Sequence, residues 1–321
     1  MKKISIVTPM FNEEEMAPIF LEALDKVLSS IKNYKFEIVA VDDGSKDNTL
    51  NVLSTLQEKY TNLVIVKLSR NFGQDYAIAA GLKIASGDAI IPIDSDLQDP
   101  VELIPELIKM WEEGYQVVNA HRASRKSDTF FKRNTAGIYY KYLHKISPRT
   151  HIPQNVANYR LVDRCVVDEI NAMNEANPIF RIQVPFVGYK VGTVDFVREK
   201  REKGESKYNL KAMTNLAFSS ITSLSSKPLL VSIKLAITFF VLFLISSITE
   251  LVLFLLQKNG LQISISEISY GAWLIINALL FVTIVILGIL SIQSIYISQV
   301  ADSSKNRPAY IIDKVIRKED K

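Results

Sequence analysis

Three carboxylates lie within six residues at the end of an apolar run, in the segment IIPIDSDLQDP (residues 90–100). The apolar part is typical of a buried strand, and Asp94, Asp96 and Asp99 follow it. Carboxylates at this spacing repel one another unless a cation lies among them, although an acidic turn in solvent is the plain alternative. Asp94 and Asp96 point to the same side of an extended chain, and Mg²⁺ is typically held by one or two carboxylates together with substrate phosphates. The spacing therefore predicts a site for a divalent cation and a diphosphate.

The acidic segment ends the last of four strand-like runs near the N-terminus. The runs cover residues 4–9, 36–42, 63–69 and 89–94. The helical patterns between them cover residues 14–31, 48–60 and 74–85. Apolar strands that alternate with helices predict an α/β fold with a parallel sheet covered on both faces. Ligands of such sheets bind beyond the carboxyl ends of the strands, so we expect four segments to meet at one edge: residues 8–13, 42–47, 69–73 and 94–99.

Composition and missing motifs exclude several classes of protein. Neither G-x-G-x-x-G after the first strand nor G-x-x-x-x-G-K-[ST] occurs, which argues against dinucleotide-binding and P-loop proteins. A net charge of only +4 gives no argument for nucleic acid as a partner. The single cysteine, Cys165, excludes an internal disulfide and fits a reducing compartment.

The composition changes sharply near Pro228. Residues 268–301 contain no charged residue, and residues 229–257 contain only Lys234 and Glu250. Each run is long enough to cross a hydrocarbon core of about 30 Å. We therefore predict three parts: a domain at residues 1–227, a two-helix transmembrane anchor at 228–300, and a tail at 301–321. Residues 206–227 have apolar side chains at mixed helical spacings, and they either pack against the domain or lie on the membrane surface as an interfacial helix.

Basic residues predict the orientation of the spans. The loop at residues 258–270 carries one lysine, whereas Lys227 precedes the spans and several basic residues follow them: Lys305, Arg307, Lys314, Arg317 and Lys318. The positive-inside rule then predicts that both the N-terminal domain and the tail are cytoplasmic. We expect a multi-pass protein of the inner (plasma) membrane with a cytoplasmic domain.

Five motifs occur in an order that indicates a family: TPMFNEE, VDDGSKDNT, RNFGQ, GDAIIPIDSDLQDP and REKREKGESKY. With the apolar spans and the tail motif NRPAYIIDKVI, they cover essentially the whole chain. The chain resembles the inverting glycosyltransferases of family 2, which have the Rossmann-like GT-A fold. More closely, it resembles the polyisoprenyl-phosphate glycosyltransferases of the dolichol-phosphate mannose synthase and bactoprenol glucosyltransferase type. Each motif is weak alone, and their order followed by the spans makes the resemblance specific.

The resemblance implies roles for residues at the predicted edge. The donor-binding residues that it implies are Pro9, Phe11, Glu13, Asp42, Asp43, Arg201 and Lys207. Carboxylates suit such positions because they accept hydrogen bonds from a base N–H and a ribose hydroxyl. A helix cap is the alternative for the residues that precede Asn48, Asp47 among them.

The implied catalytic residues are Asp94, Asp96, Gln98 and Arg122, and the first two would hold Mg²⁺ or Mn²⁺. The implied acceptor-phosphate residues are Arg122, Arg133 and Arg198. The last of these belongs to a loop that would close over both phosphates, with Gly204 as a flexible point. A solvated charged face is the alternative for Arg125 and Lys126.

The implied activity is inverting transfer of a single sugar, from UDP-glucose or a UDP-N-acetylhexosamine, to a polyprenyl phosphate (undecaprenyl phosphate). It would take place at the cytoplasmic membrane face, for cell-envelope glycan modification. Asn158 stands where relatives commonly have an aspartate, and residues 178–182 (PIFRI) also depart from the family pattern. Both departures leave the identity of the sugar open, and Asn158 is the one feature that favours the alternative of a catalytically silent, membrane-anchored regulator that binds nucleotide-sugar. The sequence does not decide between a monomer and a homo-oligomer.

Overall fold

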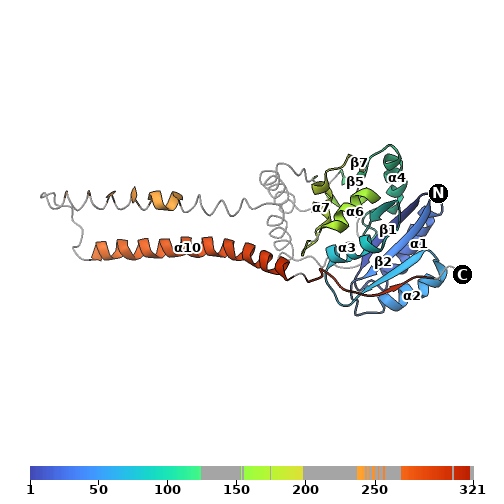
Figure 1. The fold of residues 1–321 in the computed structure, drawn as a ribbon, viewed down its shortest axis with the longest axis horizontal. Helices are drawn as coiled ribbons and strands as arrows, with labels where there is room; N and C mark the ends of the chain where they lie inside the picture. Colours follow the sequence, from blue (N-terminus) through green and yellow to red (C-terminus); the bar gives the residue numbers. More distant parts are fainter. Residues whose placement is uncertain are drawn as a thin grey trace. The chain divides into compact units, whose positions relative to one another are not determined.

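The computed structural model describes residues 1–123, 153, 155–173, 175–197, 269–305 and 307–318, with scattered helical residues between 237 and 256. The chain divides into two compact units. One comprises residues 1–220 together with 306–321, and the other comprises residues 221–305. Figure 1 shows the α/β fold of the first unit and the long helix α10 of the second.

The first unit is built on one sheet, with helices on both faces (Figure 1). Its strand order within the described residues is β7-β5-β6-β4-β1-β2-β3-β8. The strands that run in one direction are β1 (Lys3–Met10), β2 (Lys35–Asp42), β3 (Leu63–Leu68), β4 (Ala89–Pro92), β5 (Val117–Arg122) and β7 (Val191–Phe196). The strands that run against their neighbours are β6 (Val156–Asp163) and β8 (Ile312–Ile316). The predicted α/β fold with a mostly parallel sheet is confirmed.

Helices with one apolar side cover the two faces of the sheet. One face carries α1 (Met16–Leu28), α2 (Thr49–Lys59), the short 3₁₀ helix η1 (Val101–Leu103) and α4 (Ile104–Glu112). The other carries α3 (Gln74–Ile84), α6 (Arg164–Ala172) and α7 (Phe180–Val187). The strand and helix ranges predicted from the sequence are confirmed, with ends displaced by at most three residues.

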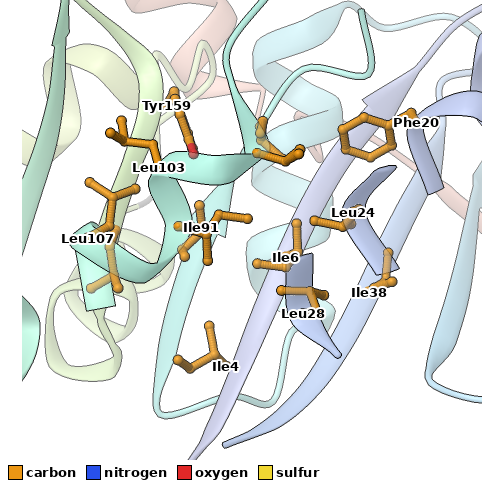
Figure 2. Close-up of a cluster of buried hydrophobic side chains, with 14 of the residues drawn as sticks. Ile4, Ile6, Phe20, Leu24, Leu28, Ile38, Ile91, Leu103, Leu107 and Tyr159 are labelled. Atoms are coloured by element: carbon orange, nitrogen blue, oxygen red, sulfur yellow. The ribbon is translucent and has the colours of Figure 1, made fainter. Parts of the chain in front are cut away.

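The core under α1 explains why that segment is a helix. Its buried residues include Phe20, Leu24 and Leu28, which recur every four positions and so form one stripe along the helix. Figure 2 shows this stripe facing Ile6 of β1 and Ile38 of β2. Burying a side chain of this size stabilises the fold by about 1.5–3 kcal/mol. Replacing Leu24 with alanine would remove that contribution and leave a cavity as well.

The C-terminal residues return to the sheet, where the sequence predicted only a tail. Strand β8 pairs antiparallel with β3, so that Val315 lies opposite Val66. The Lys67 ammonium lies 2.6 Å from the Asp313 carboxylate. Tyr310 packs against the core on the α3 side, and its hydroxyl donates to the Ala79 carbonyl at 3.4 Å. Residues 307–318 are therefore part of the α/β unit.

The second unit contains α10 (Ser269–Ser304). Residues 281–298 form the one segment of the described helices that is long and apolar enough to cross a membrane, judged by length and composition alone. None of that segment is buried, and large apolar side chains such as Ile284 and Ile297 are exposed. The other predicted span, residues 229–257, lies almost entirely outside the described residues, as do residues 206–227. The two-helix anchor and the interfacial helix therefore stay predictions.

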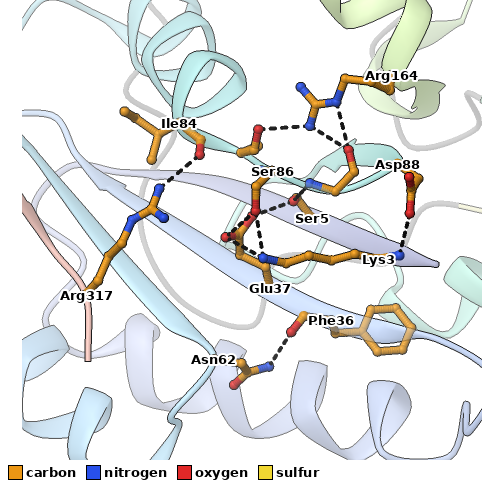
Figure 3. A network of polar contacts seen from close by, with 12 residues as sticks. Lys3, Ser5, Phe36, Glu37, Asn62, Ile84, Ser86, Asp88, Arg164 and Arg317 are labelled. Atoms are coloured by element: carbon orange, nitrogen blue, oxygen red, sulfur yellow. Dashed lines mark hydrogen bonds and ion pairs between the residues drawn. The ribbon is translucent and has the colours of Figure 1, made fainter. Parts of the chain in front are cut away.

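A buried polar network fixes the amino edge of the sheet (Figure 3). The Glu37 carboxylate accepts hydrogen bonds from Ser5 Oγ at 2.6 Å, Ser86 N at 2.9 Å, Ser86 Oγ at 3.0 Å and Lys3 Nζ at 3.0 Å. Burial by itself raises the pKa of Glu37, but these hydrogen bonds outweigh it and hold that pKa below its ordinary value. Arg164 donates to the Gly87 carbonyl at 2.8 Å. The connection from α3 to β4 is thus tied to β1 and β2, at the edge opposite the predicted site.

Candidate active site

The carboxyl ends of the parallel strands lie at one edge of the sheet. Met10 at the end of β1 lies opposite Asp42 at the end of β2, and Ile93 after β4 donates its N–H to the Val7 carbonyl. Because the connections that follow these strands all leave from this edge, the predicted donor and acidic segments share it. Pro9 lies near the end of β1, Phe11 and Glu13 follow that strand, and each of the three is partly exposed.

The loops that follow β1 and β2 are locked together. Asn12 donates its N–H to Ser45 Oγ at 3.0 Å and accepts the Lys46 N–H at 2.8 Å through its side chain. Asp47 accepts the N–H of Thr49, the first residue of α2, at 3.1 Å. Burial raises the pKa of Asp47, but the hydrogen bonds from Thr49 outweigh it and lower that pKa. Asp47 therefore bonds the first N–H of α2 from one residue before the N-cap Asn48.

Asp42 and Asp43 are both buried, and their carboxylates hold loops. Asp43 accepts the backbone N–H groups of Phe72 at 2.8 Å and Gly73 at 2.9 Å, and burial raises its pKa despite these bonds. Asp42 accepts the Ser45 N–H at 3.0 Å. Direct contact of either carboxylate with a nucleoside stays a prediction. What the structure adds is that Asp43 fixes the loop from β3 to α3.

Gly44 lets that loop approach β2. Its φ is +65°, and a Cβ at this position would lie 2.4 Å from the carbonyl carbon of Arg70. No side chain fits that space, because real Cβ atoms do not approach so closely. The glycine in the VDDGSKDNT motif is therefore required by the close packing of two loops at this edge.

The acidic segment after β4 presents two carboxylates on one side. Ile93 and Ser95 are buried, whereas Asp94 and Asp96 are partly exposed. The amide of Gln74, the first residue of α3, donates to Asp94 Oδ1 at 2.6 Å. Asp96 accepts the Gln98 N–H at 3.1 Å, next to Leu97 with its φ of +54°.

These residues fit a cation that is shared with a substrate. Among the described residues no group of three or more His, Cys, Asp and Glu side chains could hold a metal ion without other ligands. Mg²⁺ needs only one or two protein carboxylates when substrate phosphates and water complete its six positions. Asp94 and Asp96 provide two, and Gln74 restrains the first of them.

The third carboxylate of the opening motif has a different function. Asp99 is buried, and the guanidinium of Arg122 at the end of β5 donates to it at 3.3 Å. Tyr159 of β6 donates its hydroxyl to the neighbouring Pro100 carbonyl at 2.8 Å. Arg122 therefore lies beside the acidic segment, as predicted, and Asp99 is the residue that holds it there. The role of Asp99 was not predicted.

Other predicted residues lie outside the described part of the chain. These are Arg133, Arg198, Arg201 and Lys207. Their proposed contacts with donor and acceptor phosphates stay predictions. His121 lies at the end of β5 with its Nδ1 2.6 Å from Asp195 Oδ1.

A polar layer that the sequence did not predict lies between the sheet and α7. Asn119 and Asn158 are 3% and 5% exposed and lie on the face that α7 covers. The Arg160 guanidinium lies 5.5 Å from the centre of the Phe180 ring, at the start of α7. Asn158, where relatives commonly have an aspartate, is thus inside this layer. The departure from the family motif marked Asn158 as unusual, but nothing in the sequence indicated that its side chain is buried.

A mostly parallel sheet with two acidic side chains and an arginine at its carboxyl edge is typical of nucleotide-sugar-dependent transferases of the GT-A type. The model of glycosyl transferase family 2 matches residues 5–170. The chain belongs to this family and is a glycosyltransferase, and the resemblance inferred from the motifs is confirmed.

Relatives match over almost the full chain. The glycosyltransferase YkcC of Bacillus subtilis, itself described as uncharacterized, is 40% identical and the match covers 97% of this chain and 93% of that one. The bactoprenol glucosyl transferase of Shigella phage SfV is 39% identical, with 97% and 98% covered. A solved structure with the same fold is glucosyl-3-phosphoglycerate synthase from Mycobacterium tuberculosis with Mn²⁺, UDP and its product. Its TM-score is 0.51 at 20% identity, with 70% of this chain and 78% of that chain covered.

Proposed function

We propose that this glycosyltransferase moves one sugar, with inversion, from UDP-glucose or a UDP-N-acetylhexosamine to undecaprenyl phosphate at the cytoplasmic face of the membrane. The observation that carries the proposal is the ion pair between Arg122 and Asp99, which holds the arginine against the loop that also carries Asp94 and Asp96. Relatives that are 37–39% identical over nearly the full chain are named bactoprenol glucosyl transferases or homologues of them, which supports this acceptor.

The charges at the site indicate how the residues would act. Asp94 and Asp96 would hold Mg²⁺ or Mn²⁺, which when bound neutralises a diphosphate and acts as a Lewis acid toward it. Arg122 would align the acceptor phosphate, whose oxygens are already anionic near pH 7 because the second pKa of a monoester is about 6. Such a nucleophile requires alignment and needs no general base, so an asparagine at position 158 is compatible with turnover.

The pairing of β8 with β3 supports a chain that crosses the membrane an even number of times. Strand β8 follows α10 in the chain and belongs to the same sheet as β1 to β7. The chain before the predicted spans and the chain after them must therefore lie on the same side of the membrane. A chain that leaves a sheet, crosses a bilayer and returns to that sheet must cross it again. If α10 crosses once, a second crossing precedes it, where residues 229–257 were predicted to span. The basic residues near the spans favour the cytoplasmic side for the sheet.

The test uses the full-length protein in liposomes that contain undecaprenyl phosphate. We expect one UDP-sugar of a labelled panel to give an organic-soluble product, only when Mg²⁺ or Mn²⁺ is present. Asp96→Ala should lower turnover at least about 100-fold with an unchanged melting temperature, because the cation that would neutralise the diphosphate would no longer be held. Glu58→Gln, which neutralises an exposed carboxylate on α2, is the matched control.

Two outcomes would contradict the proposal. Full activity in excess chelator would remove the metal from the mechanism. Binding of UDP without product from any donor would favour the silent regulator, the reading for which Asn158 is the one argument.

A further inference from the structure

Two opposite charges lie near each other at the starts of α3 and α7 without making contact. Asp75 belongs to the first turn of α3 and Arg181 to the first turn of α7, and the two are electrostatically coupled. Within the described part of the chain, Asp75 Oδ1 and Arg181 Nε are buried and have no hydrogen-bond partner, and no ion pair within 4.0 Å joins the side chains. A buried polar atom left in this way costs about 1–3 kcal/mol, so the arrangement needs an explanation.

Fixed neighbours hold Asp75 in this position. Gln74, the residue before it, donates to Asp94 Oδ1 at 2.6 Å, and Tyr76, the residue after it, donates its hydroxyl to Asn177 Oδ1 at 2.6 Å. The first contact ties α3 to the acidic segment, and the second ties it to the residues just before α7. Asp75 thus directly follows the residue that contacts Asp94 of the predicted metal site, and it lies between two anchored neighbours on α3.

Two more buried acceptors without partners lie in the polar layer under α7. Asn119 and Asn158 are each more than nine-tenths buried, and within the described residues the Oδ1 atom of each lacks a hydrogen bond. Side chains alternate along β5 and β6, and Val117 and Val162 belong to the core on the α7 face, so Asn119 and Asn158 point to that face too. The stacking of Phe180 on Arg160 brings the start of α7 onto this part of β6. Among the described residues, buried acceptors without partners therefore occur on β5, β6 and α3, on the face of the sheet that α3 and α7 cover, and a polar ligand could satisfy them.

We propose that Asp75 and Arg181 together bind one hydroxyl group of the donor sugar and so help to determine which sugar is transferred. The inference rests on the proposed function. A hydroxyl can accept a hydrogen bond from the guanidinium and donate one to the carboxyl group at the same time, which satisfies both side chains. The buried carboxyl group disfavours an anion such as the acceptor phosphate, and an apolar group would leave both partners unsatisfied. A neutral polyol is the chemistry that remains.

The test compares the affinities of the full-length protein for UDP and for UDP-glucose in the presence of Mn²⁺. The variants are Asp75→Asn, which keeps the shape of the side chain, and Arg181→Gln. We expect Kd for UDP to stay within about twofold, while Kd for UDP-glucose rises about tenfold or more, because each variant removes a hydrogen bond to a charged group. Glu169→Gln on the exposed side of α6 is the control, and both of its affinities should match the wild type.

A second measurement identifies the hydroxyl. UDP-glucose analogues that each lack one hydroxyl are bound to the wild type and to Asp75→Asn. For one analogue the two proteins should bind equally, because the group that Asp75 contacts is already gone and the two losses are not additive.

The outcomes separate this inference from the proposed function. Suppose that the wild type makes lipid-linked product. If the variants then keep the wild-type ratio of Kd for UDP to Kd for UDP-glucose, or if every hydroxyl deletion is additive with Asp75→Asn, the subsite assignment is wrong. Water or packing then accounts for the unpaired atoms of Asp75 and Arg181. If both variants also lose UDP, the pair supports the fold and the assignment is again wrong. If the wild type forms no product and distinguishes no UDP-sugar from UDP, both proposals are wrong.

Discussion

Replacing Glu37 with glutamine should destabilise the α/β unit without touching the active site. The carboxylate accepts four hydrogen bonds, two at each oxygen, from Ser5, Ser86 and Lys3. Glutamine keeps one carbonyl oxygen for the bonds from Ser5 Oγ and Ser86 N. Its amide nitrogen replaces the other oxygen and points donors at the Lys3 ammonium, which can only donate.

The expected loss follows from these contacts. A hydrogen bond to a charged group contributes about 1.5–3 kcal/mol, against about 1 kcal/mol for a neutral one, so the two retained bonds lose about 1–2 kcal/mol together. The bond to Lys3 is partly screened because the lysine side chain is 37% exposed, and it adds less than about 1 kcal/mol. We expect a total of about 1–3 kcal/mol. For a unit of this size that lowers Tm by roughly 2–12 °C.

Thermal unfolding of the full-length protein at several pH values provides the assay, with Glu22→Gln on the exposed side of α1 as the control. The folded-state pKa of Glu37 lies below the unfolded value of about 4.3, so its stabilisation is present above that pH and is lost as pH falls through the folded pKa. The gap in Tm between wild type and Glu37→Gln should therefore be constant from pH 7 to about pH 5 and shrink below pH 4. A gap that is absent at pH 7, or that widens in acid, would refute the reasoning. Turnover at 20 °C should stay within about twofold.

Three further changes test other contacts. Gln74→Ala should raise the Mn²⁺ concentration needed for half-maximal activity about tenfold or more, because it releases Asp94, and turnover at saturating Mn²⁺ should fall much less; an unchanged metal requirement would contradict this. Tyr310→Ala should lower the free energy of unfolding of the α/β unit by about 2 kcal/mol, measured with denaturant, because it removes a ring from the core. Tyr310→Phe should change it by less than about 1 kcal/mol, and equal effects of the two variants would mean that the hydroxyl, and not the ring, anchors the tail. Asn158→Asp should alter donor preference or weaken acceptor binding without raising turnover; a large gain with a new ionisation in the pH profile of turnover would show that the reaction needs a base here.

The first four strands and three helices were predictable because each has a strong local signal. The stripe of Phe20, Leu24 and Leu28 has the period of a helix, and the run before Asp94 is continuously apolar as a doubly covered strand is. The edge that carries the acidic segment then follows from the rule for parallel sheets, without any knowledge of side-chain contacts.

What could not be predicted depends on residues far apart in the chain. In the sequence, Asp99 belongs to an apparent acidic turn and Arg122 to an apparent basic segment. They form an ion pair only because the fold places the loop after β4 next to the end of β5. Asp75 and Arg181 are separated by more than a hundred residues, and each looks like an ordinary charge in a first helical turn. The pairing of β8 with β3 was not predicted for the same reason. The sequence of a five-residue strand does not indicate which other strand it pairs with.

The position of β8 makes the order of synthesis important for folding. Lys67 leaves the ribosome 246 residues before its partner Asp313, which at about 5–20 residues per second is roughly 10 to 50 seconds earlier. During that time β3 is an edge strand with unpaired N–H and C=O groups, which is the kind of surface that pairs with other chains. Its cover is made only after the apolar helix α10 has been synthesised. Membrane insertion and completion of the sheet are therefore successive steps of one process, and a nascent chain arrested between them would be prone to aggregate through β3.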